Sequence, residues 1–150
     1  MDNLEERIDR LEAESEINRL LADYAHGIDR KELDRFMKIF HDDGEFAIPG
    51  MFEAAHGTKA IESLVREIWE GSPETHHWIT NATIDFAGPD TATGDAHTIC
   101  FLRTADGEEG VVCAYYGNSY ERRDGAWRAN SVAVHVQWMK KVEFGEISAG

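Results

Sequence analysis

The sequence is short of positive charge. It has 15 Lys and Arg residues against 29 Asp and Glu residues, which gives a formal net charge of −14 at pH 7. Because such a charge repels nucleic acids and anionic membranes, we expect neither as a partner. Cysteine is also scarce, and Cys100 and Cys113 lack the C-x-x-C spacing of metal and redox motifs. Each lies in an apolar run, so two buried free thiols are predicted rather than a disulfide.

Long apolar runs are missing as well. No stretch approaches the roughly 20 apolar residues that a transmembrane helix needs, and the first residues have neither a basic nor an apolar leader segment. We therefore expect a cytoplasmic protein. The sequence also lacks glycine-rich nucleotide motifs, a serine-hydrolase motif and any His-x-x-x-His or Cys–His cluster. These absences lead us to expect no metal and no cofactor.

Hydrophobic residues make up 42% of the 150 residues, enough for a core and a pocket in one domain over residues 1–150. Apolar residues recur at helical spacing up to His26, which predicts a long helix that ends at Gly27. Asp29 then has the position of an N-cap for a second helix over residues 30–40. The remaining pattern predicts a turn at 41–44, a short strand at 45–49, a loop at 50–57, a third helix from Thr58 that ends at 71–73, and long strands at 75–86, 91–104, 110–122 and 126–139.

Helices followed by a run of strands joined by short turns are typical of an α+β fold. A long curved sheet wrapped around a helix makes a cone with one open end. A small apolar ligand suits such a cone. Met51 and Phe52 lie in the predicted loop at 50–57, and we expect them to line the mouth of the pocket.

Three residues carry the candidate chemistry: Tyr24 and Asp29 near the end of the first helix, and His77 near the start of the first long strand. A neutral imidazole can take a proton from carbon, and a carboxylate on its other nitrogen fixes the tautomer and stabilises the imidazolium. A phenol can donate to a leaving oxygen or a developing enolate. Composition alone slightly favours a simple helix cap for Asp29, and strand alternation does not decide between His76 and His77.

Four segments together resemble the SnoaL-like branch of the NTF2-like superfamily over nearly the whole chain. They are residues 27–31 (GIDRK), 40–46 (FHDDGEF), 75–81 (THHWITN) and 120–127 (YERRDGAW). The resemblance implies an NTF2-like α+β cone, with a curved, mostly antiparallel sheet around a long N-terminal helix and two further helices. It also implies a homodimer or a higher homo-oligomer. The superfamily contains enzymes and non-enzymes, so the fold does not settle the activity.

The cofactor-free lyases of this branch use a His–Asp pair inside the cone. By resemblance His77 is the base, Asp29 its partner and Tyr24 a functional tyrosine. The expected substrate-binding residues are His97, Tyr116, His135, Met51 and Phe52. Two features depart from the dehydrochlorinases of the branch. Tyr24 stands where they have a lysine, and residues 131–135 offer no arginine on the last strand.

We therefore expect a dehydratase-like lyase that acts on a small hydrophobic cyclic or aromatic substrate. Three alternatives stay open at this point. One is a ketosteroid-type isomerase with Asp29 as the base and Tyr24 as the oxyanion donor. The second is a carbon–carbon lyase on lignin-derived aromatics, and the third is a non-catalytic module for ligand binding or oligomerisation.

Overall fold

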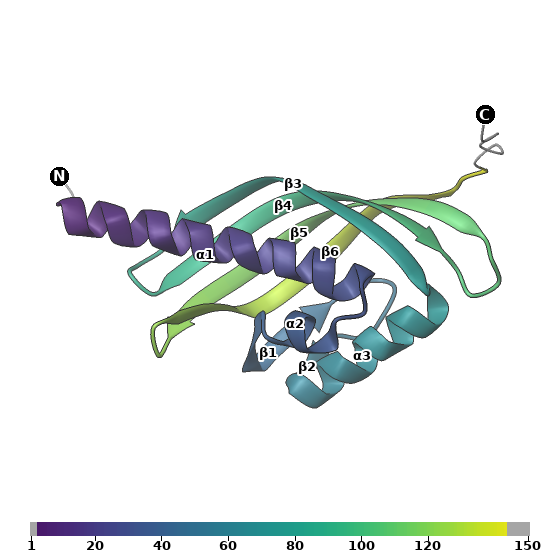
Figure 1. Cartoon of the computed structure of the whole chain (residues 1–150), viewed down its shortest axis with the longest axis horizontal. Coiled ribbons are helices and arrows are strands. Elements are labelled where there is room, and N and C mark those ends of the chain that lie inside the picture. The colour runs from purple at the N-terminus through teal and green to yellow at the C-terminus, as the bar shows by residue number, and fades with distance from the viewer. Residues whose placement is uncertain (1–2, 144–150) are drawn as a thin grey trace.

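A curved six-stranded sheet wraps around one long helix (Figure 1). The computed structural model describes residues 3–143. The elements in chain order are α1 (Leu4–Asp29), α2 (Leu33–Met37), β1 (Phe40–Ala47), β2 (Ala55–His56), α3 (Thr58–Gly71), β3 (Glu74–Phe86), β4 (Thr91–Arg103), β5 (Glu109–Arg123) and β6 (Ala126–Lys141). The strand order is β2-β1-β6-β5-β4-β3, in which β1 and β6 are parallel and the other neighbours antiparallel. The predicted α+β cone is confirmed.

Helix α1 lies across the concave face of the sheet, and α2 and α3 gather near its C-terminal end (Figure 1). The helix begins with a capping box, in which the Asn3 side chain accepts from the Glu6 backbone and the Glu6 side chain accepts from that of Asn3. Its buried residues towards the sheet include Ala13, Ile17 and Tyr24, which recur at steps of four and seven. Helix α1 therefore packs on the sheet through one face, and this packing fixes the direction of the last helical turn.

The prediction that Gly27 ends the first helix is wrong, because α1 continues to Asp29. Gly27 is buried inside the helix where α2 crosses it, and a Cβ atom at this position would lie 2.8 Å from the Cβ of Phe36. The glycine therefore permits a close approach of two helices. Asp29 is not an N-cap either, since α2 begins after Glu32 and is only 5 residues long.

The predicted turn at residues 41–44 is also wrong, because these residues belong to β1. The pairing of β1 with β6 shifts register between Phe40 and Glu45, which accommodates the glycine and aspartates of this segment as an irregularity within a strand. His41 is buried here, and its ring nitrogen Nε2 lies 2.9 Å from the carbonyl oxygen of Glu121. This histidine therefore joins β1 to the sheet.

The core lies between α1 and the concave face. Tyr24, Phe36, Phe40 and Phe46 form an aromatic cluster, with ring centroids 5.2–6.1 Å apart in the contacting pairs. Cys100 is buried and Cys113 is partly buried, and both are free. Within the described part of the chain, no helix is both long and apolar enough to cross a membrane.

Replacing Gly27 with alanine should lower the free energy of unfolding by about 1–3 kcal/mol, because the new methyl group would overlap Phe36. The matched control is Gly71→Ala at the end of α3, where a Cβ would meet nothing within 4 Å. That change should be neutral or slightly stabilising. Urea unfolding of both variants checks this packing. Equal effects of the two substitutions would contradict it.

Candidate active site

Asp29 and His77 meet at the end of α1. The Oδ1 atom of Asp29 lies 2.6 Å from Nδ1 of His77, and its Oδ2 atom accepts the backbone N–H of His77 at 2.8 Å. Thr75 donates its hydroxyl to Oδ1 at 2.8 Å. Thr75 and His77 are alternate residues of β3, so both point to the same face of the strand. One short stretch of β3 therefore supplies all three of these donors to the carboxylate.

The last turn of α1 is itself held in place. The indole N–H of Trp69 on α3 donates to the carbonyl oxygen of Ile28 at 2.8 Å. Ile28 is buried at 2% exposure, so the carbonyl at this helix end is satisfied by a side chain from another element. The position of Asp29 thus depends on α3 as well as on β3.

The electrostatics of the pair follow from burial and mutual attraction. Burial disfavours the imidazolium of His77, but the hydrogen bond to Asp29, the nearby Cys100 and the carboxylate charge outweigh it and raise the pKa of His77 to about 9. Burial also raises the pKa of Asp29, but the hydrogen bonds from His77 and Thr75 leave it below its usual value. An ionised carboxylate only accepts, so Nδ1 carries the hydrogen and Nε2 is the nitrogen left for a substrate.

Tyr24 lies beside this pair, on the buried face of α1. Its ring meets the His77 ring edge-on at 5.8 Å between centroids, and it meets the Tyr116 ring in the same way at 5.2 Å. Burial raises the pKa of both phenols above the usual value. The two tyrosines therefore stay protonated at neutral pH and can act as hydrogen-bond donors.

A narrow cavity of about 10 Å³, enough for the centre of one water molecule, borders the two tyrosines. It is lined by Leu20, Leu21, Tyr24, Ile39, Tyr116, Asn118, Tyr120, Ala129 and Val132. On this inner face Thr98 Oγ1, Tyr116 Oη and Asn118 Oδ1 are buried without a hydrogen-bond partner among residues 3–143. Burying a polar atom without a hydrogen-bond partner costs about 1–3 kcal/mol of folding stability, so several such atoms on one inner face are unusual.

The two histidines predicted to bind substrate, His97 and His135, lie away from this cavity. His97 is exposed on the outer face of β4. His135 stacks on Tyr115, also on the outer face, with 4.8 Å between ring centroids. Strand alternation explains both placements, because Thr98 and Val134 take the neighbouring inward positions. His76 is likewise exposed, near Glu74 at 3.3 Å, so His77 is the inward histidine of the pair.

The two loop residues expected at the pocket mouth do not border the cavity. Met51 is 48% exposed, and Phe52 packs against the edge of the core. Tyr116, by contrast, lines the cavity. Sequence reasoning missed Thr75 and Thr98 as polar groups of the inner face. Counting in steps of two from His77 finds Thr75, but Thr98 becomes visible only through the register of β4 with β5.

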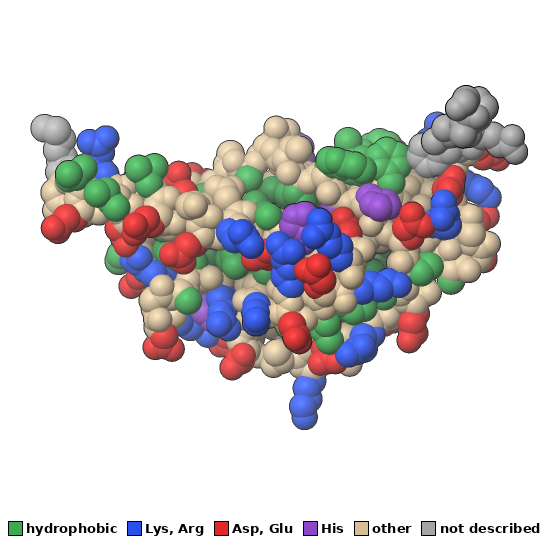
Figure 2. All heavy atoms as spheres, in the orientation of Figure 1, with side chains coloured by type: hydrophobic (Ala, Val, Ile, Leu, Met, Phe, Trp, Pro, Cys, Tyr) green, Lys and Arg blue, Asp and Glu red, His purple; other side chains and the backbone are tan. Residues whose placement is uncertain are grey.

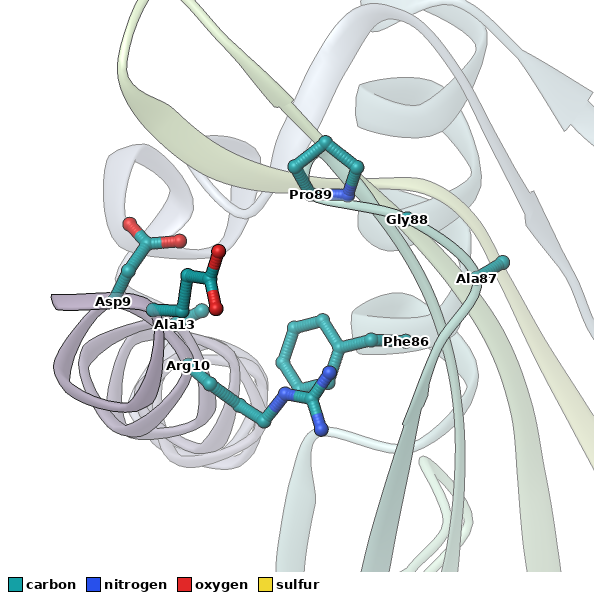
Figure 3. Close-up of a pocket in the computed structure, with 8 residues that line it drawn as sticks. Asp9, Arg10, Ala13, Phe86, Ala87, Gly88 and Pro89 are labelled. Atoms are coloured by element: carbon teal, nitrogen blue, oxygen red, sulfur yellow. The ribbon is translucent and has the colours of Figure 1, made fainter. Parts of the chain in front are cut away.

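A second cleft lies at the other end of α1, between the first turns of the helix and the β3–β4 turn (Figure 3). It is lined by Glu6, Asp9, Arg10, Ala13, Phe86, Ala87, Gly88 and Pro89. The guanidinium of Arg10 lies 5.6 Å from the Phe86 ring centroid, and Asp9 is paired with Arg122 at 2.6 Å. The charged residues of this cleft are thus accounted for by structural contacts, and neither Asp29 nor His77 lines the cleft. Across residues 3–143, no three His, Cys, Asp or Glu side chains come together as a metal site.

Comparison with known proteins supports the same family throughout. The model of the SnoaL-like domain matches residues 9–133. Hexachlorocyclohexane dehydrochlorinase 1 of Sphingobium indicum is 29% identical over 126 residues, covering 83% of this chain and 82% of that protein. The gamma-hexachlorocyclohexane dehydrochlorinase of the same species is 26% identical over 122 residues, or 81% of this chain and 78% of that protein.

Solved structures agree with the sequence matches. The crystal structure of a type 2 hexachlorocyclohexane dehydrochlorinase superposes with a TM-score of 0.88 at 26% identity, covering 95% of this chain and 99% of that one. The corresponding type 3 protein from Novosphingobium barchaimii gives a TM-score of 0.86 at 25% identity, covering 91% and 94%. The chain therefore belongs to the family of SnoaL-like domains.

Proposed function

We propose that this chain is a cofactor-independent lyase that eliminates a small group from a small hydrophobic cyclic substrate. The observation that carries the proposal is the 2.6 Å contact between Asp29 and Nδ1 of His77, beside a buried tyrosine. The names of the relatives support the reaction class, because dehydrochlorination is an elimination. The small hydrophobic substrate of those relatives supports the substrate class.

The residues divide the work of an elimination. Nε2 of His77 takes a proton from a carbon next to an activating group, and the C–H electron pair becomes the new carbon–carbon double bond. The bond to the leaving group then breaks with its electrons. Asp29 stabilises the imidazolium that forms, as a carboxylate does for a histidine base. The Tyr24 phenol donates a hydrogen bond to the developing oxyanion or to the leaving atom, and the imidazolium returns the proton to a leaving hydroxide as water.

An isomerase with Asp29 as the base fits the contacts less well. The Asp29 carboxylate already accepts from Thr75, from the His77 ring and from the His77 backbone. These bonds hold its pKa below the usual value, which makes it a weak base. His77 has a raised pKa, and within residues 3–143 its ring contacts are at Nδ1 and leave Nε2 open, so it is the stronger base.

The leaving group favoured by the geometry is oxygen. In the middle of β6, the segment 131–135 contains no arginine, and its buried inward residues Val132 and Val134 offer no positive charge. The donors beside the dyad are neutral phenols. A departing hydroxide needs protonation, which His77 and Tyr24 supply, whereas a departing chloride gains more from a cation.

Replacing His77 with alanine or Asp29 with asparagine should lower kcat by about 10²–10⁴-fold, since the base or its orienting partner is lost. Two probe reactions serve as readouts: water loss from 3-hydroxycyclohexanone, followed by enone absorbance, and chloride release from hexachlorocyclohexane. The control is His76→Ala, which removes the exposed neighbour and should leave the rate unchanged. Undiminished turnover in both dyad variants would contradict the proposal. Turnover of neither probe by the wild-type protein would favour the non-catalytic alternative.

We propose further that two copies pair through the outer face of the sheet. Trp78, Ile99, Cys113 and Trp138 stand in one register row across β3, β4, β5 and β6. Trp78 and Trp138 are 56% and 50% exposed. Figure 2 shows hydrophobic side chains gathered over this part of the sheet. An exposed apolar row flanked by polar surface is typical of an interface, and a two-fold axis would bring a second such row against it.

Replacing Trp138 with glutamate should convert the homo-oligomer into monomers, because it would place a charge inside the apolar contact. Light scattering after size-exclusion chromatography measures the mass. Met51→Glu is the control, since Met51 is also exposed but lies in the loop between β1 and β2. A monomeric wild-type protein, or an unchanged mass in the Trp138 variant, would refute the proposed interface.

A further inference from the structure

The unpaired polar atoms of the inner face lie together. Tyr116 and Asn118 are alternate residues of β5 and share one face, and both line the internal cavity. Thr98 lies on the adjacent strand β4, where its register partner is Ala114. A fourth unpaired atom, Nε1 of Trp127, lies apart from these, on a ring that packs against Phe86 at 5.8 Å between centroids. Two of the unpaired groups therefore line the cavity, and the third, on Thr98, lies behind them on the same inner face, near the Tyr116 hydroxyl.

The surrounding residues leave these atoms unsatisfied. Asn118 donates its Nδ2 to the hydroxyl of Tyr120 at 2.9 Å, which leaves its Oδ1 atom as a free acceptor. The Tyr116 phenol lies close enough to the hydroxyls of Tyr24 and Thr98 for these to influence its pKa, yet it completes no hydrogen bond among the described residues. The wall therefore offers hydroxyl donors and one amide acceptor. Buried polar groups are nearly always paired, so an unpaired set of this kind points to a missing partner.

This polar wall is continuous with the dyad. Tyr24 contacts both the His77 ring and the Tyr116 ring. On β4, Cys100 lies two residues after Thr98 on the same face, and its Sγ atom is 3.8 Å from Nδ1 of His77. A ligand that reaches His77 from the cavity would therefore pass its far end along Tyr116 and Asn118.

We infer that this site takes an oxygen-bearing cyclic ligand, whose oxygen accepts from Tyr116 or Thr98 and whose hydroxyl hydrogen donates to Asn118. The inference rests on the proposed function and specifies its substrate class. A chlorinated carbon is a weak acceptor and cannot donate, so a polychlorinated hydrocarbon would leave the wall unpaired. Leu20 and Leu21 form the partly exposed side of this narrow cavity, so a ring enters only if these two side chains move aside.

One buried water molecule is the competing explanation, since the space now open in the cavity is about that of a single water. A water would satisfy the same atoms without any ligand. If the wall binds a ligand oxygen, removing the Tyr116 or Thr98 hydroxyl weakens the preference for a hydroxylated ligand. If the wall binds only water, that preference does not change. Ligands of the same shape that differ in one polar group distinguish the two explanations.

The test uses p-cresol, p-xylene and 4-chlorotoluene, which exchange a hydroxyl, a methyl and a chlorine at one ring position. None of them has a group to eliminate, so the result does not depend on turnover by His77. Isothermal titration calorimetry gives the ratio of Kd for p-xylene to Kd for p-cresol in each protein. The ratio cancels effects common to both ligands. Tyr116→Phe and Thr98→Val each remove one unpaired hydroxyl with little change of shape.

We expect the ratio to fall by about fivefold to tenfold in the Tyr116→Phe protein and by a similar factor in the Thr98→Val protein, as for the loss of one hydrogen bond. The ratio for 4-chlorotoluene should follow that for p-xylene. Tyr115→Phe makes the same chemical change on the outer face and should leave every ratio unaltered.

A ratio that stays the same in both inner-face variants would overturn the inference and assign the wall to bound water. Failure of all three probes to bind would overturn it too. Either result would leave the lyase proposal standing, because that proposal is judged by the turnover of the His77 and Asp29 variants. Conversely, if the wild-type protein prefers p-cresol over p-xylene but has no lyase activity, the ligand site is supported and the lyase proposal is contradicted.

Discussion

The Asp29 carboxylate is the point on which the site depends. It accepts from the Thr75 hydroxyl, the His77 ring and the His77 backbone N–H, all on one stretch of β3. The backbone contact matters because it ties the orientation of the carboxylate to the path of the strand rather than to a side-chain rotamer alone. An ionised Asp29 in turn fixes the tautomer of His77 and leaves Nε2 free. These three hydrogen bonds both hold α1 against β3 and set the protonation state of the His77 ring.

The rest of the chain serves to keep α1 and β3 in this relation. Trp69 of α3 holds the carbonyl of Ile28, and Gly27 lets α2 lie close against the same turn. On the other side, the cluster around Tyr24 and Phe36 sets how deeply α1 sits on the sheet. The result is a buried polar centre inside an apolar cone. Such a centre strengthens electrostatic interactions and makes each unpaired polar atom costly.

The sequence was sufficient for the α+β architecture and for the long strands, because period-two and helical patterns are strong there. It wrongly predicted a helix end at Gly27 and a turn at residues 41–44. Glycine is typical of helix ends and turns, and only the tertiary structure shows that these glycines lie at a close helix crossing and in an irregular strand. It suggested Asp29 and His77 as a pair, but their contact depends on residues 48 positions apart. His97 and His135 faced outward because strand register, which fixes the inward face, is set by tertiary pairing.

The most direct test of the coupling between Asp29 and His77 is the pH dependence of kcat/KM for dehydration of 3-hydroxycyclohexanone, in wild type and in Asp29→Asn. Only neutral His77 accepts a proton, and its pKa is raised from 6.5 to about 9, so activity should rise with pH through that higher value. Without the carboxylate, burial dominates and lowers the pKa, so the rise should move to lower pH at a reduced plateau. A rate that is flat or falling with pH, or the same midpoint in both proteins, would contradict the account.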